Sequence, residues 1–218
     1  MKKATISILI GTVVCMILLP NPSLAIELTG GLKIGANFAN LYGEDLKEME
    51  EELGEDFESR LGICIGGFIT FNISEMFAIQ PEVLYSMKGS KAEGTLFGET
   101  FKVKFNISYL EIPVLVKLRI PTQGNVKPSL FAGPSLAIKL SGKSKVEYAG
   151  ESEEEDIEEL KNTDFGLIIG AGVDLGFGFL GQGKITVDLR YNFGLTKISE
   201  ENDEVKNKVI SLMIGYSF

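Results

Sequence analysis

The sequence of 218 residues contains no histidine and no tryptophan, and it has only two cysteines. Without histidine, serine–histidine and cysteine–histidine nucleophilic catalysis is excluded, and so is a histidine-ligated metal site. Cys15 lies in an N-terminal apolar run that we expect to be removed as a signal peptide. Cys64 is then the one cysteine of the mature chain, and no internal disulfide can form. We expect Cys64 to serve packing. We expect no enzyme of the protease or acyl-transfer type, no cofactor and no metal site.

Long apolar runs are also scarce, and the one that is present stands at the N-terminus. It follows the basic head "MKK" and ends at "PNPSLA", which places small residues at Ser23 and Ala25. This order is typical of a secretory signal peptide, and the apolar run is short for the alternative, a transmembrane anchor. We predict cleavage after Ala25, which leaves a signal peptide at 1–25 and one domain at 26–218.

Positive charge is in deficit, with 21 lysines and arginines against 30 acidic residues and a formal net charge of −9. Removal of the signal peptide takes away Lys2 and Lys3 and changes −9 to −11. This acidity argues against a nucleic-acid partner. Much of it lies in the segments 43–60 and 150–160, which we expect to be solvated loops. The carboxylate runs Glu50–Glu52 and Glu153–Asp156 could alternatively bind divalent cations weakly.

The sequence is rich in glycine, with 25 residues, and in segments where apolar and polar residues alternate. Eight such segments occur, at 30–41, 60–71, 77–88, 99–120, 127–140, 163–177, 183–195 and 209–218. Most approach or exceed the roughly 9–11 residues that a tilted membrane strand needs. Long connections at about 42–59, 89–98, 141–162 and 196–206 alternate with short ones, which is typical of outer-membrane barrels. The pattern predicts an all-β, eight-stranded antiparallel up-and-down transmembrane barrel.

Several residues interrupt this pattern. The alternation slips by one position at Tyr109–Leu110, which predicts a β-bulge in that strand. Three prolines stand inside predicted strands, where a closed barrel has no edge to accommodate them, so bulges are expected there too: Pro81, Pro113 and Pro134. Apolar residues in the first long connection have near-helical spacing and indicate a short surface helix: Leu46, Met49, Leu53 and Phe57.

The polar face of the strands decides which side meets lipid. It carries glycine, serine, threonine, asparagine and charges of both signs, which suit a narrow, packed lumen. A soluble lipocalin-like barrel would place apolar residues inside and scatter charge over its exterior, whereas under that interpretation the exterior of this chain would be glycine-rich with sparse charge. Because buried charges must be paired, we expect a structural charge network in the lumen, with a gated ion path as the alternative. Its expected members are Glu82, Glu111, Lys117, Arg119, Asp174, Asp188 and Arg190.

The chain ends in "VISLMIGYSF", which alternates to its last residue. In lipid no water can satisfy an unpaired strand edge, so the last strand is expected to pair with the first. The terminal aromatics Tyr216 and Phe218 resemble the C-terminal signal by which the barrel-assembly machinery recognises its clients. We therefore expect that machinery to be a partner during biogenesis.

Proline-centred motifs bring a resemblance into view. They are "IQPEVLYSMKG" (79–89), "YLEIPVLVKLR" (109–119), "KPSLFAGPSLAIKL" (127–140), "DFGLIIGAGVDL" (164–175) and "VDLRYNFGLTKI" (187–198). Together they resemble the PorT-type outer-membrane β-barrel family. The resemblance implies an eight-stranded barrel related in architecture to OmpA and OmpX, in the outer membrane of a Gram-negative-type bacterium. It does not imply one function.

An eight-stranded lumen is just wide enough to be filled by side chains, which disfavours a general porin. We therefore expect a structural or surface-interaction role through long acidic extracellular loops. The expected partners are outer-membrane lipid and an unidentified extracellular or envelope component. Two alternatives remain open at this point: a narrow channel for ions or small solutes, and a soluble lipocalin-like ligand-binding barrel.

Overall fold

The computed structural model describes residues 27–44, 47, 51, 58–96, 99–148, 151–157, 160–176, 183–199 and 205–218. These residues form nine strands: β1 (Glu27–Tyr42), β2 (Glu58–Asn72), β3 (Phe77–Leu96), β4 (Glu99–Arg119), β5 (Val126–Tyr148), β6 (Glu151–Asp156), β7 (Thr163–Gly176), β8 (Lys184–Gly194) and β9 (Lys206–Ser217). The predicted signal peptide and the helix residues Leu46, Met49, Leu53 and Phe57 lie outside the described residues. Within the described ranges, no helix is long and apolar enough to cross a membrane.

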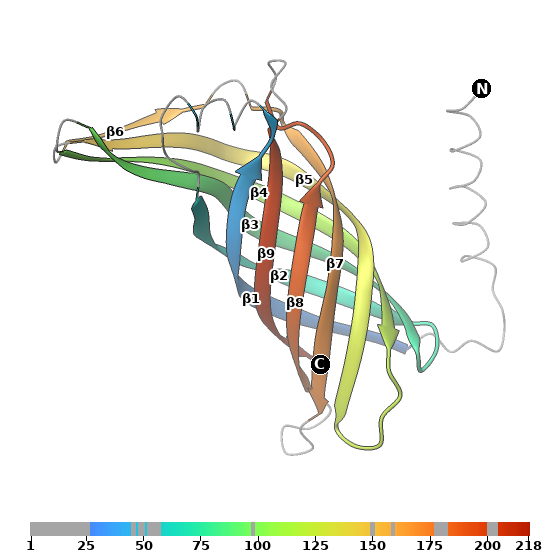
Figure 1. Ribbon diagram of the computed structural model, residues 1–218. Coiled ribbons are helices and arrows are strands. Elements are labelled where there is room, and N and C mark those ends of the chain that lie inside the picture. Colours follow the sequence, from blue (N-terminus) through green and yellow to red (C-terminus); the bar gives the residue numbers. More distant parts are fainter. Residues whose placement is uncertain are drawn as a thin grey trace, which may run out of the picture.

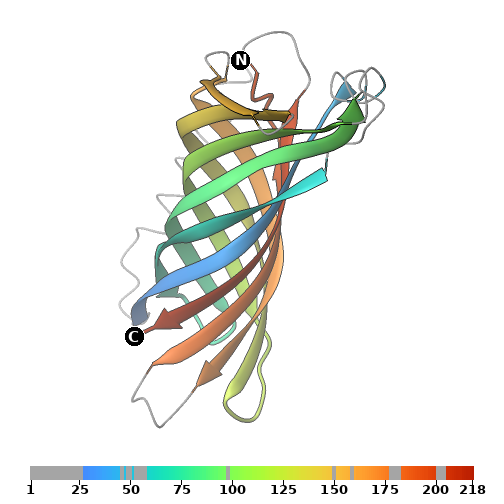
Figure 2. The same ribbon diagram turned by 90° about the vertical axis from the view of Figure 1, so that its left-hand side faces the viewer.

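Eight of the strands form a closed antiparallel ring in the order β1, β2, β3, β4, β5, β7, β8 and β9 (Figure 2). The ring closes where β9 pairs with β1, from Gly31–Ser217 to Tyr42–Lys206. Beyond the last strand pair, the backbone of Phe218 still exchanges two hydrogen bonds with Gly30, of 2.9 and 3.3 Å. The predicted eight-stranded barrel, closed by its first and last strands, is confirmed.

The two faces of the ring differ as the alternation predicts. On β1, Leu32 and Ile34 point outward and are 67% and 57% exposed, whereas Lys33 between them is 2% exposed. Outward-facing Val116, Leu189 and Ile214 continue the apolar surface around the ring. The soluble lipocalin-like alternative is therefore wrong, because such a barrel would bury its apolar face and expose its charged one.

A β-bulge does lie beside the predicted position, but the extra residue is in β5, and the phase slip in the sequence of β4 has another cause. The register of β4 against β3 runs without a shift from Leu84–Glu111 to Leu96–Glu99. Against β5 it shifts by one residue at Ser108–Tyr109, and the extra residue is Leu140 of β5. From Ile107 to Lys117 every odd-numbered residue of β4 is buried, so the apolar ones near Ile107 fill the interior. The sequence pattern slips because the lumen changes from apolar to polar at this level.

The three strand prolines are not accommodated by bulges. Their partners follow an unshifted register: Pro81–Val114, Pro113–Ser135 and Pro134–Leu167. The predicted bulges are therefore wrong. Beside Pro134, a Cβ added to Gly133 would lie 1.9 Å from the Val114 carbonyl oxygen. The missing side chain lets β5 lie close to β4 where proline removes a ladder donor.

At the end of the barrel opposite the C-terminus, strands β3, β4, β5 and β6 continue as a projecting sheet, here called the sheet extension (Figure 1). It replaces much of two predicted loops, because β3 reaches Leu96, β4 begins at Glu99, and β5 runs to Tyr148 before β6 pairs back onto it. Outside the bilayer neither face of a strand meets lipid, so these strands lack the strong alternation that marks the barrel wall.

Candidate functional site

The centre of the lumen holds a four-residue ion cluster, contributed by β1, β3 and β8. Arg190 donates to both carboxylate oxygens of Glu82, at 2.6 and 2.9 Å, and to Asp188 at 2.9 Å. Lys33 donates to the same two carboxylates at 3.0 and 2.6 Å. All four side chains are at most 3% exposed. Two cations and two anions therefore neutralise one another away from water, as burial requires.

A second buried group lies nearer the projecting end. Lys88 lies 3.3 Å from Glu111, which also accepts hydrogen bonds from Ser135 at 2.8 Å and Asn192 at 2.5 Å. The Lys88 ammonium stands 5.2 Å from the centre of the Tyr109 ring. These contacts join β3, β4, β5 and β8 across the lumen and leave the Glu111 carboxylate with three donors.

A third and looser group lies toward the other end of the barrel. Asp174 is 3.9 Å from Lys117 and 4.0 Å from Arg119. Asp174 and Arg119 are partly open to a charged vestibule of about 460 Å³ at the short-turn end, which Glu27, Lys127 and Lys184 also line. Distances near 4 Å and access to solvent make these contacts weaker than those of the central cluster.

The structure brings the seven sequence-predicted charges together as three groups rather than one network. Glu82, Asp188 and Arg190 share the central cluster, Glu111 stands in the second, and Lys117, Arg119 and Asp174 form the third. Lys33 and Lys88 also stand at polar positions of the alternating segments, but the predicted network did not include them. Their alternation phase matched that of the other inward charges, and this signal could have identified them.

Between the groups the lumen is filled. The void beside the central cluster, lined in part by Cys64, Arg190 and Met213, measures about 20 Å³, which is room for one water molecule. Cys64 is 2% exposed and packs with Leu84 and Met213. Among the residues that the structure describes, no group of three or more acidic or cysteine side chains could hold a metal ion.

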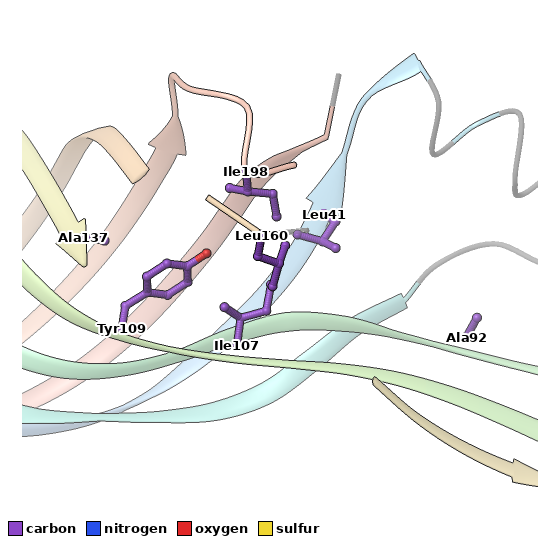
Figure 3. Packing of buried hydrophobic residues seen from close by; sticks show 7 residues of the cluster. All are labelled: Leu41, Ala92, Ile107, Tyr109, Ala137, Leu160 and Ile198. Atoms are coloured by element: carbon purple, nitrogen blue, oxygen red, sulfur yellow. The ribbon is translucent and has the colours of Figure 1, made fainter. Parts of the chain in front are cut away.

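The end of the lumen nearest the sheet extension is apolar. Leu41, Ile107, Leu160 and Ile198 meet there (Figure 3), and Tyr109 and Ala137 belong to the same buried cluster. Two of these residues come from the connections that follow β6 and β8, so those connections fold into the opening of the barrel. An apolar cap therefore lies above the ionic layers.

The outward face of the sheet extension carries a lattice of paired charges. Lys91 lies 2.9 Å from Glu58, Lys102 lies 3.1 Å from Glu93, and Glu147 lies 3.2 Å from Lys104 and 2.8 Å from Lys145. At the edge of the extension, Lys143 of β5 contacts Glu154 of β6 at 2.5 Å. This contact raises the pKa of Lys143, and it lowers the pKa of Glu154.

Strand β6 differs from this balanced lattice. All six of its residues are exposed, and five of them are acidic. It pairs with β5 alone and is the last strand in the sheet order, so within the described part of the chain its other edge is open. Apart from Glu154, its acidic side chains form no ion pair with a described lysine or arginine. The edge therefore presents unpaired backbone groups beside uncompensated negative charge.

At the opposite end, Tyr216 and Phe218 point outward and are 40% and 72% exposed. Their place at the end of the closing strand fits the predicted assembly signal, which stays a prediction.

A model of the family described as outer membrane protein beta-barrel domain matches residues 21–200 of the chain. Similar solved structures include Neisserial surface protein A, at 18% identity over 86% of this chain and 95% of that one, with a TM-score of 0.45. OprG from Pseudomonas aeruginosa matches at 12% identity over 89% and 95%, with a TM-score of 0.49. Ail, the attachment invasion locus protein of Yersinia pestis, matches at 14% identity over 88% and 100%, with a TM-score of 0.41. No curated protein matches the chain in sequence.

Proposed function

The chain belongs to the outer membrane protein beta-barrel domain family, and from this premise we propose that it acts as a surface-docking barrel for a cationic extracellular partner. Proteins of this family lie in the outer membrane, where barrels turn their longer connections outward and their short turns to the periplasm. From this asymmetry we infer that the sheet extension lies outside the cell. The open acidic edge of β6 carries the proposal.

Two properties of β6 favour a partner that adds as an extended strand. An open edge offers main-chain donors and acceptors to an added strand, which is a recurrent mode of peptide recognition. The side chains add charge on both faces of that strand, because Glu151, Glu153 and Glu155 alternate with Glu154 and Asp156. A segment with lysine or arginine at alternate positions matches this edge in both hydrogen bonding and charge.

The same acidic composition explains why the open edge is tolerated. Charged residues on an exposed edge repel the identical edge of a second molecule and so suppress self-association. A cationic strand, in contrast, is attracted by the same charges. We therefore propose a heterologous partner rather than a second copy of the chain.

A binding assay on the refolded barrel in phospholipid nanodiscs tests the proposal. The probe is an eight-residue peptide alternating lysine and valine, with the corresponding glutamate–valine peptide as its control. The variant Glu151→Gln/Glu153→Gln/Glu155→Gln keeps the strand but removes three charges. If each exposed charge contributes about 0.5 kcal/mol, the variant should bind the lysine peptide about tenfold more weakly.

A matched variant, Glu27→Gln/Glu75→Gln, removes charge at the short-turn end and should bind as the wild type does. Raising the ionic strength should weaken wild-type binding and should affect the triple variant less. Equal affinity of the wild type and the triple variant would remove β6 from the function.

The channel alternative finds less support. A conducting lumen needs a continuous polar path, whereas the middle of this barrel is filled by paired side chains around a void of about 20 Å³. The proposal assigns no catalytic activity, in keeping with the absence of histidine from the sequence. Within the family, we further propose that the chain is of the PorT type, on the strength of its proline-centred strand motifs.

A further inference from the structure

An apolar cavity of about 120 Å³ lies in the cap at the extracellular end of the lumen. The barrel wall contributes Leu41 from β1 and Phe105 and Ile107 from β4. The connection after β6 contributes Ile157 and Leu160, and the connection before β9 contributes Val205. Among the described residues of its lining, Ser199 alone has a polar side chain. We call this space the mouth cavity.

Backbone hydrogen bonds hold the walls of the mouth cavity in place. The Lys161 amide donates to the Ile198 carbonyl at 2.8 Å, and the Ile198 amide donates to the Val205 carbonyl at 2.9 Å. These bonds tie the two connections together. The Ile157 amide donates to the Gly142 carbonyl at 2.9 Å, which ties the first of them to β5. The cavity is therefore preformed, and a ligand would not have to order its walls.

One glycine makes room for the wall. A Cβ on Gly142 would lie 2.4 Å from Leu160 Cδ1. The missing side chain gives the end of the Leu160 side chain room to enter the barrel opening, where it joins the cluster that holds Ile107 and Leu41 (Figure 3).

The floor of the cap separates the mouth cavity from the ionic layers. Tyr109 is 1% exposed, and its hydroxyl accepts a hydrogen bond from Asn207 at 3.4 Å. Beneath it stand Lys88 and Glu111. An apolar molecule would leave favourable surroundings if it moved further inward, so the cavity does not continue as a path through the ionic layers.

These features select the chemistry of an occupant. A water molecule is retained in a cavity by two to four polar partners, and a lining with a single hydroxyl does not supply them. An apolar cavity of roughly 150 Å³ in another protein stays dry and binds benzene or xenon. We propose that the mouth cavity is a binding site for a small apolar molecule of benzene size. This inference does not depend on β6, which lies outside the cavity lining.

The full chain, refolded in detergent with labelled isoleucine, leucine and valine methyl groups, can be titrated with benzene and followed by NMR. The methyl signals of Leu41, Ile107, Leu160 and Ile198 should shift and saturate. Those of outward-facing Leu130 and Ile214 should shift in proportion to benzene without saturating, because benzene partitions into the detergent around them. Mouth-cavity signals that stay unchanged, or that follow the outward signals without saturation, would overturn the proposal.

Two variants sharpen the test. Val205→Phe fills the cavity and should weaken saturable benzene binding at least about tenfold, whereas Val116→Phe makes the same change on the lipid face and should leave binding unchanged. Leu160→Ala enlarges the cavity and should allow saturable binding of naphthalene, which the wild type should refuse. If Val205→Phe does not fold, the naphthalene result decides. Undiminished benzene binding by folded Val205→Phe, or no naphthalene binding by Leu160→Ala, would refute the assignment.

Discussion

Replacement of Arg190 by alanine should destabilise the barrel more than any other single charge removal in the lumen. The wild-type cluster is neutral, with Arg190 and Lys33 facing Glu82 and Asp188. Arg190→Ala removes three hydrogen bonds and leaves two carboxylates facing one lysine in a site without solvent. Removal of one partner from a buried ion pair costs about 3–5 kcal/mol, mainly through the charge left behind. We expect a loss in this range.

Equilibrium unfolding in urea, with the protein in detergent or lipid vesicles, measures this loss. The double variant Arg190→Ala/Glu82→Gln restores a neutral cluster and should recover much of the stability. Arg119→Ala is the control, because Arg119 is 4.0 Å from its partner and partly exposed, and it should cost less than about 1 kcal/mol. An unchanged unfolding midpoint for Arg190→Ala would refute the reasoning. A double variant less stable than the single one would do so as well.

Three further predictions follow from other parts of the molecule. Gly66→Ala should cost about 1–3 kcal/mol, because its Cβ would lie 2.0 Å from the Val83 carbonyl oxygen, whereas Gly67→Ala, with its nearest contact at 3.5 Å, should change stability little in the same urea assay. Pure protein in planar bilayers should show no steady conductance steps. Regular steps would show that the lumen is open in the bilayer rather than filled by side chains. The Lys143–Glu154 ion pair should hold at neutral pH. Its contribution to stability through Glu154 is present above the ordinary carboxyl pKa of 4.5 and is lost as pH falls through the lowered pKa. Its contribution through Lys143 is present below the ordinary pKa of 10.5 and is lost as pH rises through the raised pKa. NMR titration of both side chains should therefore place the Glu154 midpoint below 4.5 and the Lys143 midpoint above 10.5, and midpoints at the ordinary values would contradict the pairing.

The barrel wall could be predicted because lipid outside and packed polar groups inside impose a strict two-residue period. The last strand, predicted at 209–218, is observed as Lys206–Ser217, and the strand predicted at 183–195 is observed as Lys184–Gly194. Even a single position such as Lys33 shows the rule, since it is buried between two exposed apolar neighbours.

The sheet extension could not be predicted in the same way. At residues such as Ala92 and Lys102 the strands have left the bilayer, so no medium forces one face to be apolar, and the segment reads as a polar loop. The apolar cap caused the opposite error, because its inward-facing residues have the apolar character expected of the lipid face. Ile107 and Tyr109 are apolar and face inward, so assigning apolar residues to lipid predicts a slip within β4, although the extra residue at this level belongs to β5 and the register of β4 against β3 is unbroken.

The partners within the lumen were the least accessible part of the site. Alternation places Glu82 and Arg190 on the inward face, but they are 108 residues apart in the sequence. Their contact depends on the tilt of the strands and the closure of the ring. Identifying which charges pair across a barrel therefore requires the structure, whereas the set of inward charges can be identified from the sequence.

The central claim is that apolar side chains face lipid and polar ones face the axis. Since the natural sequence has no tryptophan, single tryptophans report without background. Ile214→Trp and Met213→Trp place the probe at neighbouring positions of β9 that are 57% and 1% exposed. In vesicles of lipids brominated on their acyl chains, the account predicts strong quenching of the tryptophan at 214 and weak quenching at 213. Equal or reversed quenching would contradict it.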